Sequence, residues 1–351
     1  MELCRATGLF ACVVSLWIVH ASPVSADCRV DGAEGTSGFT MHLSAGCTEA
    51  EREARAIVGA KIIQAIKEGK AVDLSGVVVR GDVQFGDLPS GTPPKELETI
   101  VAGAEGDLRI VPAAFTIVNS TVRGAIRHPS THGRLVFSGP VTLSGTTFEQ
   151  VVDLSRAVFV HPVTWSGAIF LRECYFVQGQ FLADVFAEKT AFGPHARFHR
   201  SRFRGPVTFQ QSGFSGMAEF LEVEFDREAN FSRTYFKLGT GFSGSRFGKL
   251  ADFSEALFDR EAFFTFTQFG GDAFFRRATF RSTADFDDAR FDGRDDFEKV
   301  LFEGESRFAR VKRPAQRPGA LGVESPQVQY VITLSLLVFS ALLIVYLIRS
   351  R

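Results

Sequence analysis

The sequence predicts an all-β solenoid that carries one helix on its N-terminal side and one membrane-spanning helix near its C-terminus. Three observations support this prediction. The 351 residues include 37 Phe but only 4 Tyr, 3 Met and 2 Trp, which indicates that one structural position is filled again and again by the same residue. Of these Phe, 28 recur at every eleventh position of the chain. Residues 328–347 form an apolar run without a charged side chain.

This regular period comes from two interleaved series. Taking every eleventh position from Phe137 to Phe302 gives 16 positions, and all 16 are Phe. A second series ends at Phe308 and is Phe at 12 of 16 positions; the exceptions are Leu143, Leu154, Trp165 and Ala187. A small residue stands two positions before most of these Phe, as Ser245 does before Phe247. Residues two apart face the same side of an extended chain, so both positions are predicted to point inward.

These small-x-Phe-x-x units resemble the pentapeptide-repeat family, in its Phe-centred form in which units of five and six residues alternate. The resemblance covers about Phe137 to Phe308, roughly half of the chain, and the repeat domain is assigned to residues 137–311. It implies a right-handed quadrilateral β-helix, in which each unit forms one side and four units form a coil of roughly 22 residues. About eight coils would stack about 4.8 Å apart. The Phe rings would form ladders along the stack, with Phe203 between Phe181 and Phe225.

One irregularity interrupts the second series. Phe186 stands one residue before the position where Phe is expected, so the order of five and six is reversed between Phe181 and Phe192. This reversal predicts a bulge or an altered corner. Cys174 stands in the small position ahead of Phe176 and is therefore predicted to be a buried apolar side chain and not a reactive thiol.

Residues 27–136 precede the repeat and are predicted to cap it, because an open solenoid end exposes its core and its strand edges. This cap region contains a predicted helix over residues 49–68 and irregular strands. Residues 72–85 alternate as strands do and are predicted to start the sheet stack. Thr48 and Glu51 form a capping box at the start of the helix, and Gly69 closes it. The apolar face of the helix comprises Ala54, Ile57, Val58, Ile62, Ala65 and Ile66.

The two ends of the chain predict export and membrane anchoring. Residues 1–26 have the pattern of a signal peptide, with Arg5 ahead of a short apolar run and small residues ahead of the cleavage site. An uncleaved N-terminal anchor is the alternative. At 1.5 Å per residue, residues 328–347 are long enough to span a hydrocarbon core of roughly 30 Å as a helix.

Residues 312–327 would link the solenoid to this helix, and residues 348–351 would form a cytoplasmic tail that contains two Arg. The predicted protein is a single-pass membrane protein with an exported body, periplasmic or extracellular, and a helix that contacts membrane lipid. An apolar span with terminal Arg also resembles the sorting signals that exosortase-like enzymes trim, although the Pro-Glu-Pro type of motif is absent. Whether the helix is retained or processed stays open.

Cysteine usage fits an oxidising compartment. Cys28 and Cys47 remain after signal cleavage and are candidates for a disulfide that closes a short N-terminal loop. The alternative is that these two residues and Cys174 are all unpaired, and the spacing does not decide between the two.

Charge and motifs argue against several activities. The chain has 39 basic and 40 acidic side chains, so it has no long-range field that would attract nucleic acid. Some members of the pentapeptide-repeat family mimic DNA, but residues 192–311 carry 19 acidic against 18 basic side chains, so this role is rejected. No nucleotide-binding or nucleophile motif is present. His195 and His199 fall on different corners of the repeat, so no metal site and no cofactor are expected.

The sequence therefore favours a non-enzymatic scaffold in the cell envelope that offers charged outer faces to another envelope protein, with an oligomeric state that stays open. The candidate interaction surface is Arg276, Arg277, Asp287, Asp288, Asp295 and Asp296. The alternative is an envelope hydrolase whose site lies in residues 88–138. In that case His128, His132 and a carboxylate would converge in one pocket.

Overall fold

The computed structural model describes residues 27–92, 95, 107–128 and 133–314. The chain divides into two compact units, Met1–Lys312 and Arg313–Arg351, and every element described below belongs to the first. Among the described residues, no helix is long and apolar enough to cross a membrane. The predicted signal peptide, membrane span and cytoplasmic tail lie outside the described residues and stay predictions.

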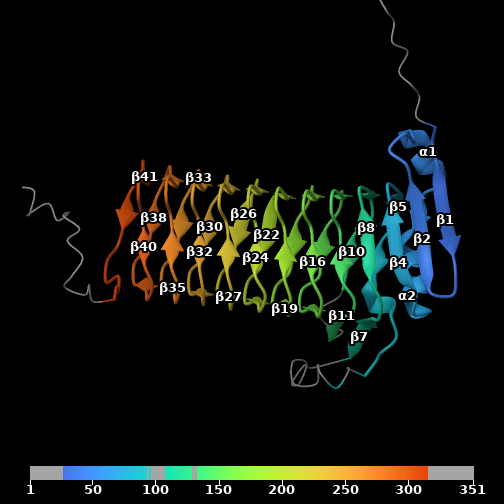
Figure 1. Ribbon diagram of the computed structural model, residues 1–351, viewed down its shortest axis with the longest axis horizontal. Helices are drawn as coiled ribbons and strands as arrows, with labels where there is room; N and C mark the ends of the chain where they lie inside the picture. The colour runs from blue at the N-terminus through green and yellow to red at the C-terminus, as the bar shows by residue number, and fades with distance from the viewer. Residues whose placement is uncertain (1–26, 93–94, 96–106, 129–132, 315–351) are drawn as a thin grey trace, which may run out of the picture. The chain divides into compact units, whose positions relative to one another are not determined.

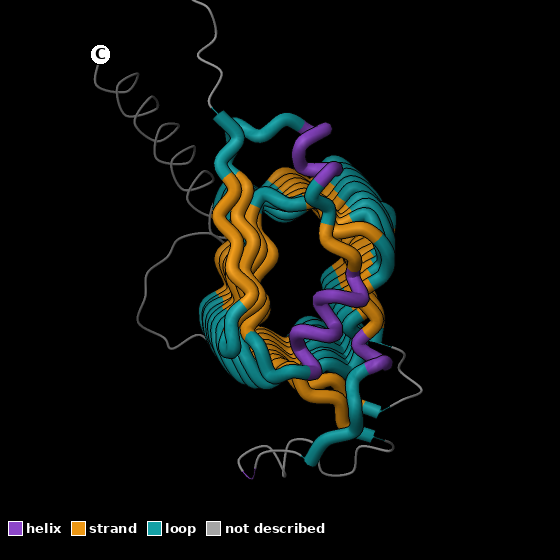
Figure 2. The backbone as a smooth tube through the Cα atoms, turned by 90° about the vertical axis from the view of Figure 1, so that its right-hand side faces the viewer, coloured by secondary structure: helices purple, strands orange, loops and turns teal. Residues whose placement is uncertain are grey.

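Short strands form a β-solenoid with four sheets, here named A, B, C and D (Figures 1 and 2). The chain visits the four sheets in turn and returns to the first one coil further on. Strands of successive coils pair in parallel, as Phe159 pairs with Phe181 and Phe181 with Phe203. Sheet B contains 11 strands, so the described residues make about eleven turns. The predicted all-β solenoid is confirmed.

Sheet A faces the viewer in Figure 1, with sheet B along the upper side and sheet D along the lower side. Sheet A comprises β1 (Val30–Glu34), β2 (Gly38–Leu43), β4 (Ala71–Ser75), β8 (Phe115–Val118), β12 (Val141–Thr142), β16 (Val163–Thr164), β20 (Val185–Phe186), β24 (Val207–Thr208), β28 (Ala229–Asn230), β32 (Ala251–Asp252), β36 (Ala273–Phe274) and β40 (Asp295–Asp296). Sheet B comprises β3 (Ile57–Val58), β5 (Val78–Arg80), β9 (Thr121–Val122), β13 (Thr147–Phe148), β17 (Ile169–Phe170), β21 (Ala191–Phe192), β25 (Gly213–Phe214), β29 (Tyr235–Phe236), β33 (Leu257–Phe258), β37 (Thr279–Phe280) and β41 (Leu301–Phe302).

The other two sheets complete each coil. Sheet C comprises β6 (Val83–Gln84), β10 (Ile126–Arg127), β14 (Val152–Asp153), β18 (Cys174–Tyr175), β22 (His195–Arg197), β26 (Met217–Glu219), β30 (Thr240–Gly241), β34 (Ala262–Phe263), β38 (Ala284–Asp285) and β42 (Ser306–Arg307). Sheet D comprises β7 (Leu108–Val111), β11 (Arg134–Phe137), β15 (Val158–Phe159), β19 (Gln180–Phe181), β23 (Arg202–Phe203), β27 (Glu224–Phe225), β31 (Arg246–Phe247), β35 (Gln268–Phe269) and β39 (Arg290–Phe291).

Stacked Phe rings fill the interior of the solenoid. Phe203 lies between Phe181 and Phe225, with ring centroids 4.6 and 5.2 Å apart and nearly parallel rings, so the predicted ladders are confirmed. Rings of adjacent ladders meet edge to face, as Phe242 and Phe253 do at 5.2 Å and 83°. Each fully buried Phe contributes on the order of 1.5–3 kcal/mol, and the ladders therefore dominate the stability of the stack.

The position two residues before each inward Phe also points inward. Small residues occupy it because a Phe ring fills the space beside them. Where this residue is Ser or Thr, its buried hydroxyl joins two coils. The Oγ of Ser245 donates to the carbonyl of Phe220 and accepts from the N–H of Val223. A buried polar group must be hydrogen-bonded in this way to be tolerated in an apolar core. Cys174 is fully buried in the same position, as predicted, and burial raises the pKa of its thiol.

Two of the four corners of each coil contain a residue with positive φ. In the coil that contains β32 this residue is Glu255, with φ of 58°, and the turn is closed by a hydrogen bond from the N–H of Ala256 to the carbonyl of Phe253. Gly167 occupies the same position in an earlier coil, and Gly244 occupies the equivalent position at the diagonal corner. Glycine there avoids the steric cost of a left-handed backbone.

The prediction of a bulge or an altered corner at Phe186 is wrong. β20 keeps the regular register with β16 and β24. Ala187 takes the inward position and is fully buried, whereas Phe186 points outward and is 38% exposed. The core accepts a small residue here because Trp165, one coil away, is larger than Phe and packs against Phe176 and Phe198.

The N-terminal end is capped by two helices, and the prediction of one helix over residues 49–68 is wrong. α1 (Glu49–Ala54) begins at the capping box of Thr48 and Glu51 as predicted, but it ends at Ala54. β3 follows and pairs with β5, and α2 (Gly59–Lys67) then crosses the end of the coil (Figure 2). The β-branched pair Ile57 and Val58 favours this strand over a continuous helix.

Burial divides the predicted apolar face along the same boundary. Ile62, Ala65 and Ile66 of α2 are buried against the end of the stack, whereas Ala54 and Val58 are exposed. Gly69 follows α2 with φ of 75°, as expected of a residue that closes a helix.

The sheet stack begins well before residue 137. β4, β5 and β6 already belong to sheets A, B and C, and η1 (Phe85–Asp87), a 3₁₀ turn, follows them. Val and Leu fill the inward positions in these coils, as Leu74 and Val79 do. The prediction that residues 72–85 start the sheet stack is thus confirmed. β1 and β2 add an antiparallel pair at the end of sheet A. A disulfide between Cys28 and Cys47 ties the start of β1 to the loop before α1.

Candidate interaction surfaces

The six predicted surface residues do not form one surface. Arg276 and Arg277 lie at a corner between sheets A and B, and Asp295 and Asp296 lie on β40 of sheet A. Asp287 and Asp288 follow β38 at the opposite corner, between sheets C and D. Because the four sheets succeed one another around the coil, these two corners are diagonal to each other. The structure thus divides the predicted surface into two separate parts.

The part near sheet A is held together by Asp296. This carboxylate is only 6% exposed and accepts from Nε of Arg276 at 2.7 Å. Arg294 also pairs with it at 2.8 Å, and the guanidinium of Arg276 lies 4.5 Å from the ring centre of Phe274. Burial opposes ionisation of Asp296, but the hydrogen bond from Arg276 and the neighbouring charges hold its pKa below the usual value. Asp296 therefore positions the corner, while the exposed Arg277 beside it faces solvent.

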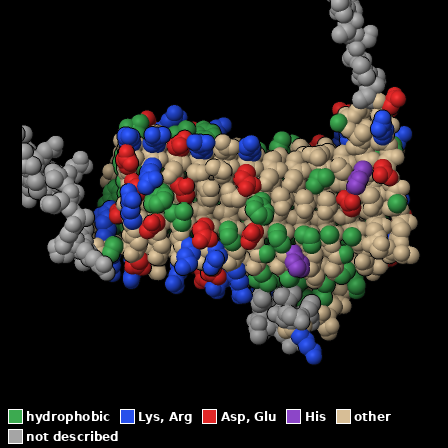
Figure 3. Space-filling view, viewed as in Figure 1, with side chains coloured by type: hydrophobic (Ala, Val, Ile, Leu, Met, Phe, Trp, Pro, Cys, Tyr) green, Lys and Arg blue, Asp and Glu red, His purple; other side chains and the backbone are tan. Residues whose placement is uncertain are grey.

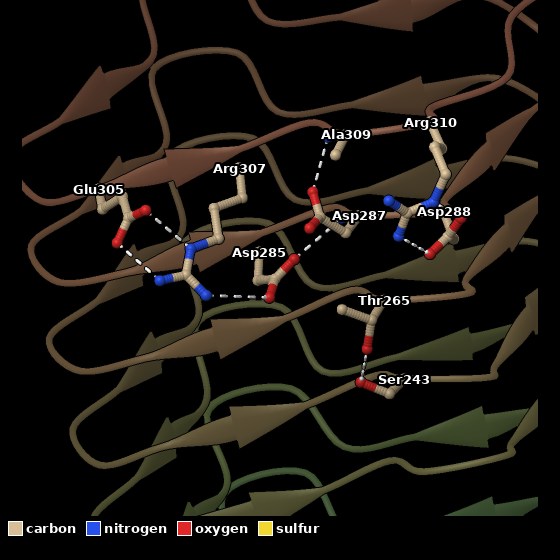
Figure 4. A network of polar contacts seen from close by, with 9 residues as sticks. All are labelled: Ser243, Thr265, Asp285, Asp287, Asp288, Glu305, Arg307, Ala309 and Arg310. Carbon is tan, nitrogen blue, oxygen red and sulfur yellow. Dashed lines mark hydrogen bonds and ion pairs between the residues drawn. The ribbon is translucent and has the colours of Figure 1, made fainter.

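Figure 4 shows the part between sheets C and D. Asp288 accepts two hydrogen bonds from Arg310 at 2.6 and 2.7 Å, and the pKa of Asp288 is lowered chiefly by these bonds. Asp287 accepts from the N–H of Ala309. Nε of Arg307 donates to Glu305 at 2.8 Å. Both predicted carboxylates of this corner are thus satisfied by residues of the neighbouring coil.

Ion pairs between successive coils recur along the stack. Arg200 pairs with Glu222, Arg202 with Glu224 and Arg233 with Glu255. The partners lie directly above one another because each corner and each strand repeats in every coil. Figure 3 shows that charged side chains gather over the coils of sheet A nearest to β40.

The residues proposed for the alternative hydrolase do not converge in the described part of the chain. His128 is fully buried, and its Nε2 lies 3.2 Å from the carbonyl oxygen of Gly133. His132 lies outside the described residues. His195 pairs with Glu219 at 2.8 Å, and His199 follows at the next corner. No group of three or more His, Cys, Asp and Glu side chains among the described residues is arranged to hold a metal ion.

A hollow of about 950 Å³ lies in the cap beside β1, β2 and β4, and the sequence did not suggest it. Nε2 of His42 lies 3.1 Å from Asp73, and the side chains are 40% and 47% exposed. The strand register places Asp31 and Ser75 on either side of His42. Among the described residues neither Ser44 nor Ser75 is hydrogen-bonded to His42, so the hollow has a His–Asp pair without an activated hydroxyl.

Sheet B carries an apolar band that the sequence analysis also missed. In four successive coils its outward residues are Ile169, Ala191, Gly213 and Tyr235. The following corner adds Leu171 in the first coil and Leu238 in the fourth, which are 53% and 41% exposed. The sequence contains a signal for this band. The residue before each Phe of sheet D is polar in most coils, whereas the residue before the Phe of sheet B is not polar in these coils. The inward Phe and small residues give the stronger periodic signal, and they do not depend on the outward residue.

A second apolar feature is a pair of exposed rings on one coil. Phe263 on sheet C is 40% exposed, and Phe266 at the next corner is 64% exposed. Phe266 has φ of 57°, a conformation that is unusual for a bulky side chain. The coil before has Gly241 and Gly244 in the corresponding positions.

The fold and these surfaces define the class of the protein: a capped parallel β-solenoid with a Phe-filled core and patterned outer faces. A comparison of the chain with models of protein families, with curated proteins and with solved structures finds no match.

Proposed function

We propose that this protein is an exported, membrane-anchored solenoid of the pentapeptide-repeat type, and that it acts as a protein-interaction scaffold in the cell envelope. The observation that supports this proposal best is the filled interior. Consecutive rings are only 4.5 Å apart between Phe192 and Phe214 and 5.4 Å apart between Phe170 and Phe192. Close packing of this kind leaves no room for a substrate between the ladders, so recognition must use outward side chains.

The family assignment is supported by the coil geometry. The resemblance implies four sheets per coil, a Phe of one coil directly above a Phe of the next, and inward pairs of one small residue and one Phe, and the stack has these features. We propose that the solenoid is the right-handed quadrilateral β-helix of that family.

The proposed location is supported from both ends of the chain. The apolar run over residues 328–347 and the two Arg behind it favour a retained membrane helix with a cytoplasmic tail. The disulfide between Cys28 and Cys47 favours an oxidising compartment for the body, since disulfides persist outside the cytoplasm.

The corner between sheets A and B is the surface that we assign to the protein partner. It presents Arg233, Glu255, Arg277 and Lys299 in successive coils, all with positive φ and all exposed. Charges of both signs in a fixed order give specificity and attract a partner only at short range. The predicted residue Arg277 belongs to this row.

The experiment is quantitative co-purification from crosslinked membranes with an Arg277→Glu/Lys299→Glu variant. The matched control is Arg204→Glu/Lys249→Glu, which reverses two exposed charges at the corner between sheets D and A. We expect the first variant to lose the crosslinked partner and the control to retain it, with equal thermal melting. Equal retention by both variants would contradict the assignment. Loss of the biological activity through His42→Ala alone, with folding intact, would instead place chemistry in the hollow of the cap.

A further inference from the structure

The apolar band of sheet B is defined by Ile169, Leu171, Ala191, Gly213, Tyr235 and Leu238. Its profile is uneven. The two outer coils carry large side chains, whereas the two middle coils carry only a methyl group at Ala191 and no side chain at Gly213. Pro194 and Ser215 continue the middle coils across the corner without a charge, and the half-buried Leu257 extends the border beyond Tyr235. The band is therefore low in the middle and bordered by large apolar side chains on both sides.

The dimensions of the band fit one kind of occupant. The two outer coils are three coil steps apart, which corresponds to about 14 Å at about 4.8 Å per step. An α-helix with its side chains is about 10–12 Å wide. A helix that lies parallel to the strands of sheet B would fit between Ile169 and Leu171 on one side and Tyr235 and Leu238 on the other.

Close approach to the middle coils is possible because Ala191 is small and exposed and Gly213 has no side chain. A Cβ atom placed on Gly213 would have no other atom within 4 Å, so the space above it is open. Gly216, at the following corner, is different, because a Cβ there would lie 1.8 Å from the carbonyl oxygen of Pro194. Glycine at 216 is thus required by the packing of the coils, whereas the absence of a side chain at 213 shapes only the outer surface.

The charges at the ends of the band determine which charges a bound helix should carry beside its apolar face. Lys189 lies at the corner ahead of β21, and Lys237 lies at the corner after β29; both are exposed. Neither lysine makes an ion pair with any residue that the structure describes. The nearby carboxylates are engaged. Glu188 accepts from Ser166, and Glu173 contacts Arg172. Asp259, which follows β33 as Lys237 follows β29, accepts from the hydroxyl of Tyr235 and from Arg281. The rim of the band therefore offers positive charge to a partner.

We propose that this band binds an amphipathic helix of a partner protein, whose apolar face is bordered by carboxylates. The apolar face packs on Ala191 and Gly213 between the two rows of large side chains, and its carboxylates pair with Lys189 and Lys237. Recognition of a helix in this way relies on apolar anchors one turn apart. The inference rests on the proposed scaffold function and assigns a second surface to it.

The test uses the full-length protein in lipid nanodiscs and a fluorescein-labelled synthetic helix of about five turns, with Leu and Ala on one face and Glu along both borders. Fluorescence anisotropy should show saturable binding. Gly213→Tyr should weaken it at least tenfold, because the new ring fills the middle of the band. The fold accepts this change, since Tyr235 already occupies the same position one coil further on. The matched control Thr279→Tyr adds the same ring on β37, outside the band, and should leave binding unchanged.

Charge supplies an independent readout. A second peptide with Lys in place of Glu should bind at least tenfold more weakly, and Lys189→Glu/Lys237→Glu should reverse the preference between the two peptides. Equal binding of both peptides by the unmodified protein, or unchanged binding of the Glu peptide by Gly213→Tyr, would overturn the proposal. Dimerisation that Gly213→Tyr abolishes would assign the band to a second copy and would also overturn it. If Arg277→Glu/Lys299→Glu still removes the natural partner, the scaffold function stands and only the assignment of this band fails.

Discussion

Phe264 and Phe266 are only two residues apart in the chain but lie in opposite environments. Phe264 is fully buried and stacks on Phe242 and Phe286 at 5.0 and 4.7 Å. Phe266 lies at the next corner in a left-handed conformation and is 64% exposed. The first residue stabilises the fold, whereas the second carries a conformational cost, and the two should respond to substitution in opposite ways.

Phe264→Ala should lower the free energy of unfolding by about 3–5 kcal/mol, because it removes a buried ring and leaves a cavity that the stacked neighbours cannot close. Urea unfolding followed by circular dichroism measures the change. Lys249→Ala, at an exposed position, is the control and should stay within about 0.5 kcal/mol. Similar losses from the two variants would mean that the inward and outward positions are wrongly assigned.

Phe266→Gly should leave the free energy of unfolding unchanged or raise it by up to about 1 kcal/mol, since glycine adopts positive φ without steric cost. Gly244 occupies the same position in the preceding coil and shows that the turn accepts glycine. The same urea titration tests this prediction. A loss above about 1 kcal/mol would show that the exposed ring makes a stabilising contact.

Sequence reasoning at this scale succeeded wherever the regular period held. It placed Phe203, Ser245 and Cys174 in the core, because in-out alternation along a strand is a local property of the chain. It misplaced Phe186, because the preference of a ring for burial suggested a bulge. The register of three parallel strands outweighed that preference, and Trp165 supplied the missing volume from the neighbouring coil. Compensation between residues one coil apart is invisible to a local pattern.

At the scale of the element, the corners of the solenoid are joined by ion pairs between successive coils. Arg200 with Glu222 and Arg310 with Asp288 are two such pairs between sheets C and D. Hydrogen bonds from the arginines hold the pKa of Glu222 and of Asp288 below the usual values. A carboxyl whose pKa is lower in the folded state stabilises the fold above its unfolded pKa, and this contribution disappears as the pH falls through the folded pKa.

The midpoint of thermal unfolding should therefore fall as the pH is lowered below about 4, since unfolded Asp and Glu titrate near 3.9 and 4.3. Circular dichroism melts between pH 7 and pH 2.5 give the profile. A Glu222→Gln/Asp288→Asn variant should lose less on acidification than the unmodified protein, because two of the linked carboxyls are gone. Parallel profiles for the two proteins would mean that these pairs contribute nothing to stability.

The cap is the other element whose stability can be tested through one bond. The disulfide joins Cys28 and Cys47 across a sequence separation of 19. Closing a loop of this size restricts the unfolded chain and stabilises the folded state by about 3 kcal/mol. Cys28→Ser/Cys47→Ser should increase amide hydrogen exchange in β1, β2 and α1, while β31 and its neighbours in the middle of the stack stay protected. Unchanged exchange in the cap would show that its packing alone suffices.

The cap also shows why element boundaries were harder to predict than the repeat. The capping box at Thr48 is a local motif and was found. The break between α1 and α2 depends on pairing of Ile57 with Val79 of β5, a contact between different coils. The apolar residues on both sides of the break continue a helical spacing, so nothing in the local pattern marks the strand.

For the whole protein, the sequence predicted a solenoid and its orientation relative to the membrane, and it predicted candidate surface residues without their arrangement. Arg277 and Asp287 are close in the chain but lie at diagonal corners, because the chain passes a corner in every repeat unit. Neighbours on the surface are residues of successive coils, which explains why the band of sheet B and the hollow at His42 were not foreseen. The orientation in the membrane is a prediction that experiment can settle.

Protease added to spheroplasts should digest or release the body and leave a small C-terminal fragment in the membrane, because the predicted span over residues 328–347 would protect only itself and the tail. Immunoblotting with an epitope placed after Arg351 detects the fragment. Lysed cells supply the control for complete digestion. Full protection of the body in spheroplasts with a verified open outer barrier would exclude the proposed topology.

The coil-to-coil register has a consequence for how such a gene can change. Duplication of the codons for one coil would insert a complete turn and leave every later residue on its own sheet. Duplication of the codons for half a coil would rotate the later part of the chain by half a turn about the solenoid axis. Residues of sheet A would then lie in the place of sheet C, and residues of sheet B in the place of sheet D. The Phe series would still match, because sheets A and C share one series and sheets B and D share the other. Unequal recombination could thus exchange outer faces freely while the core stays intact.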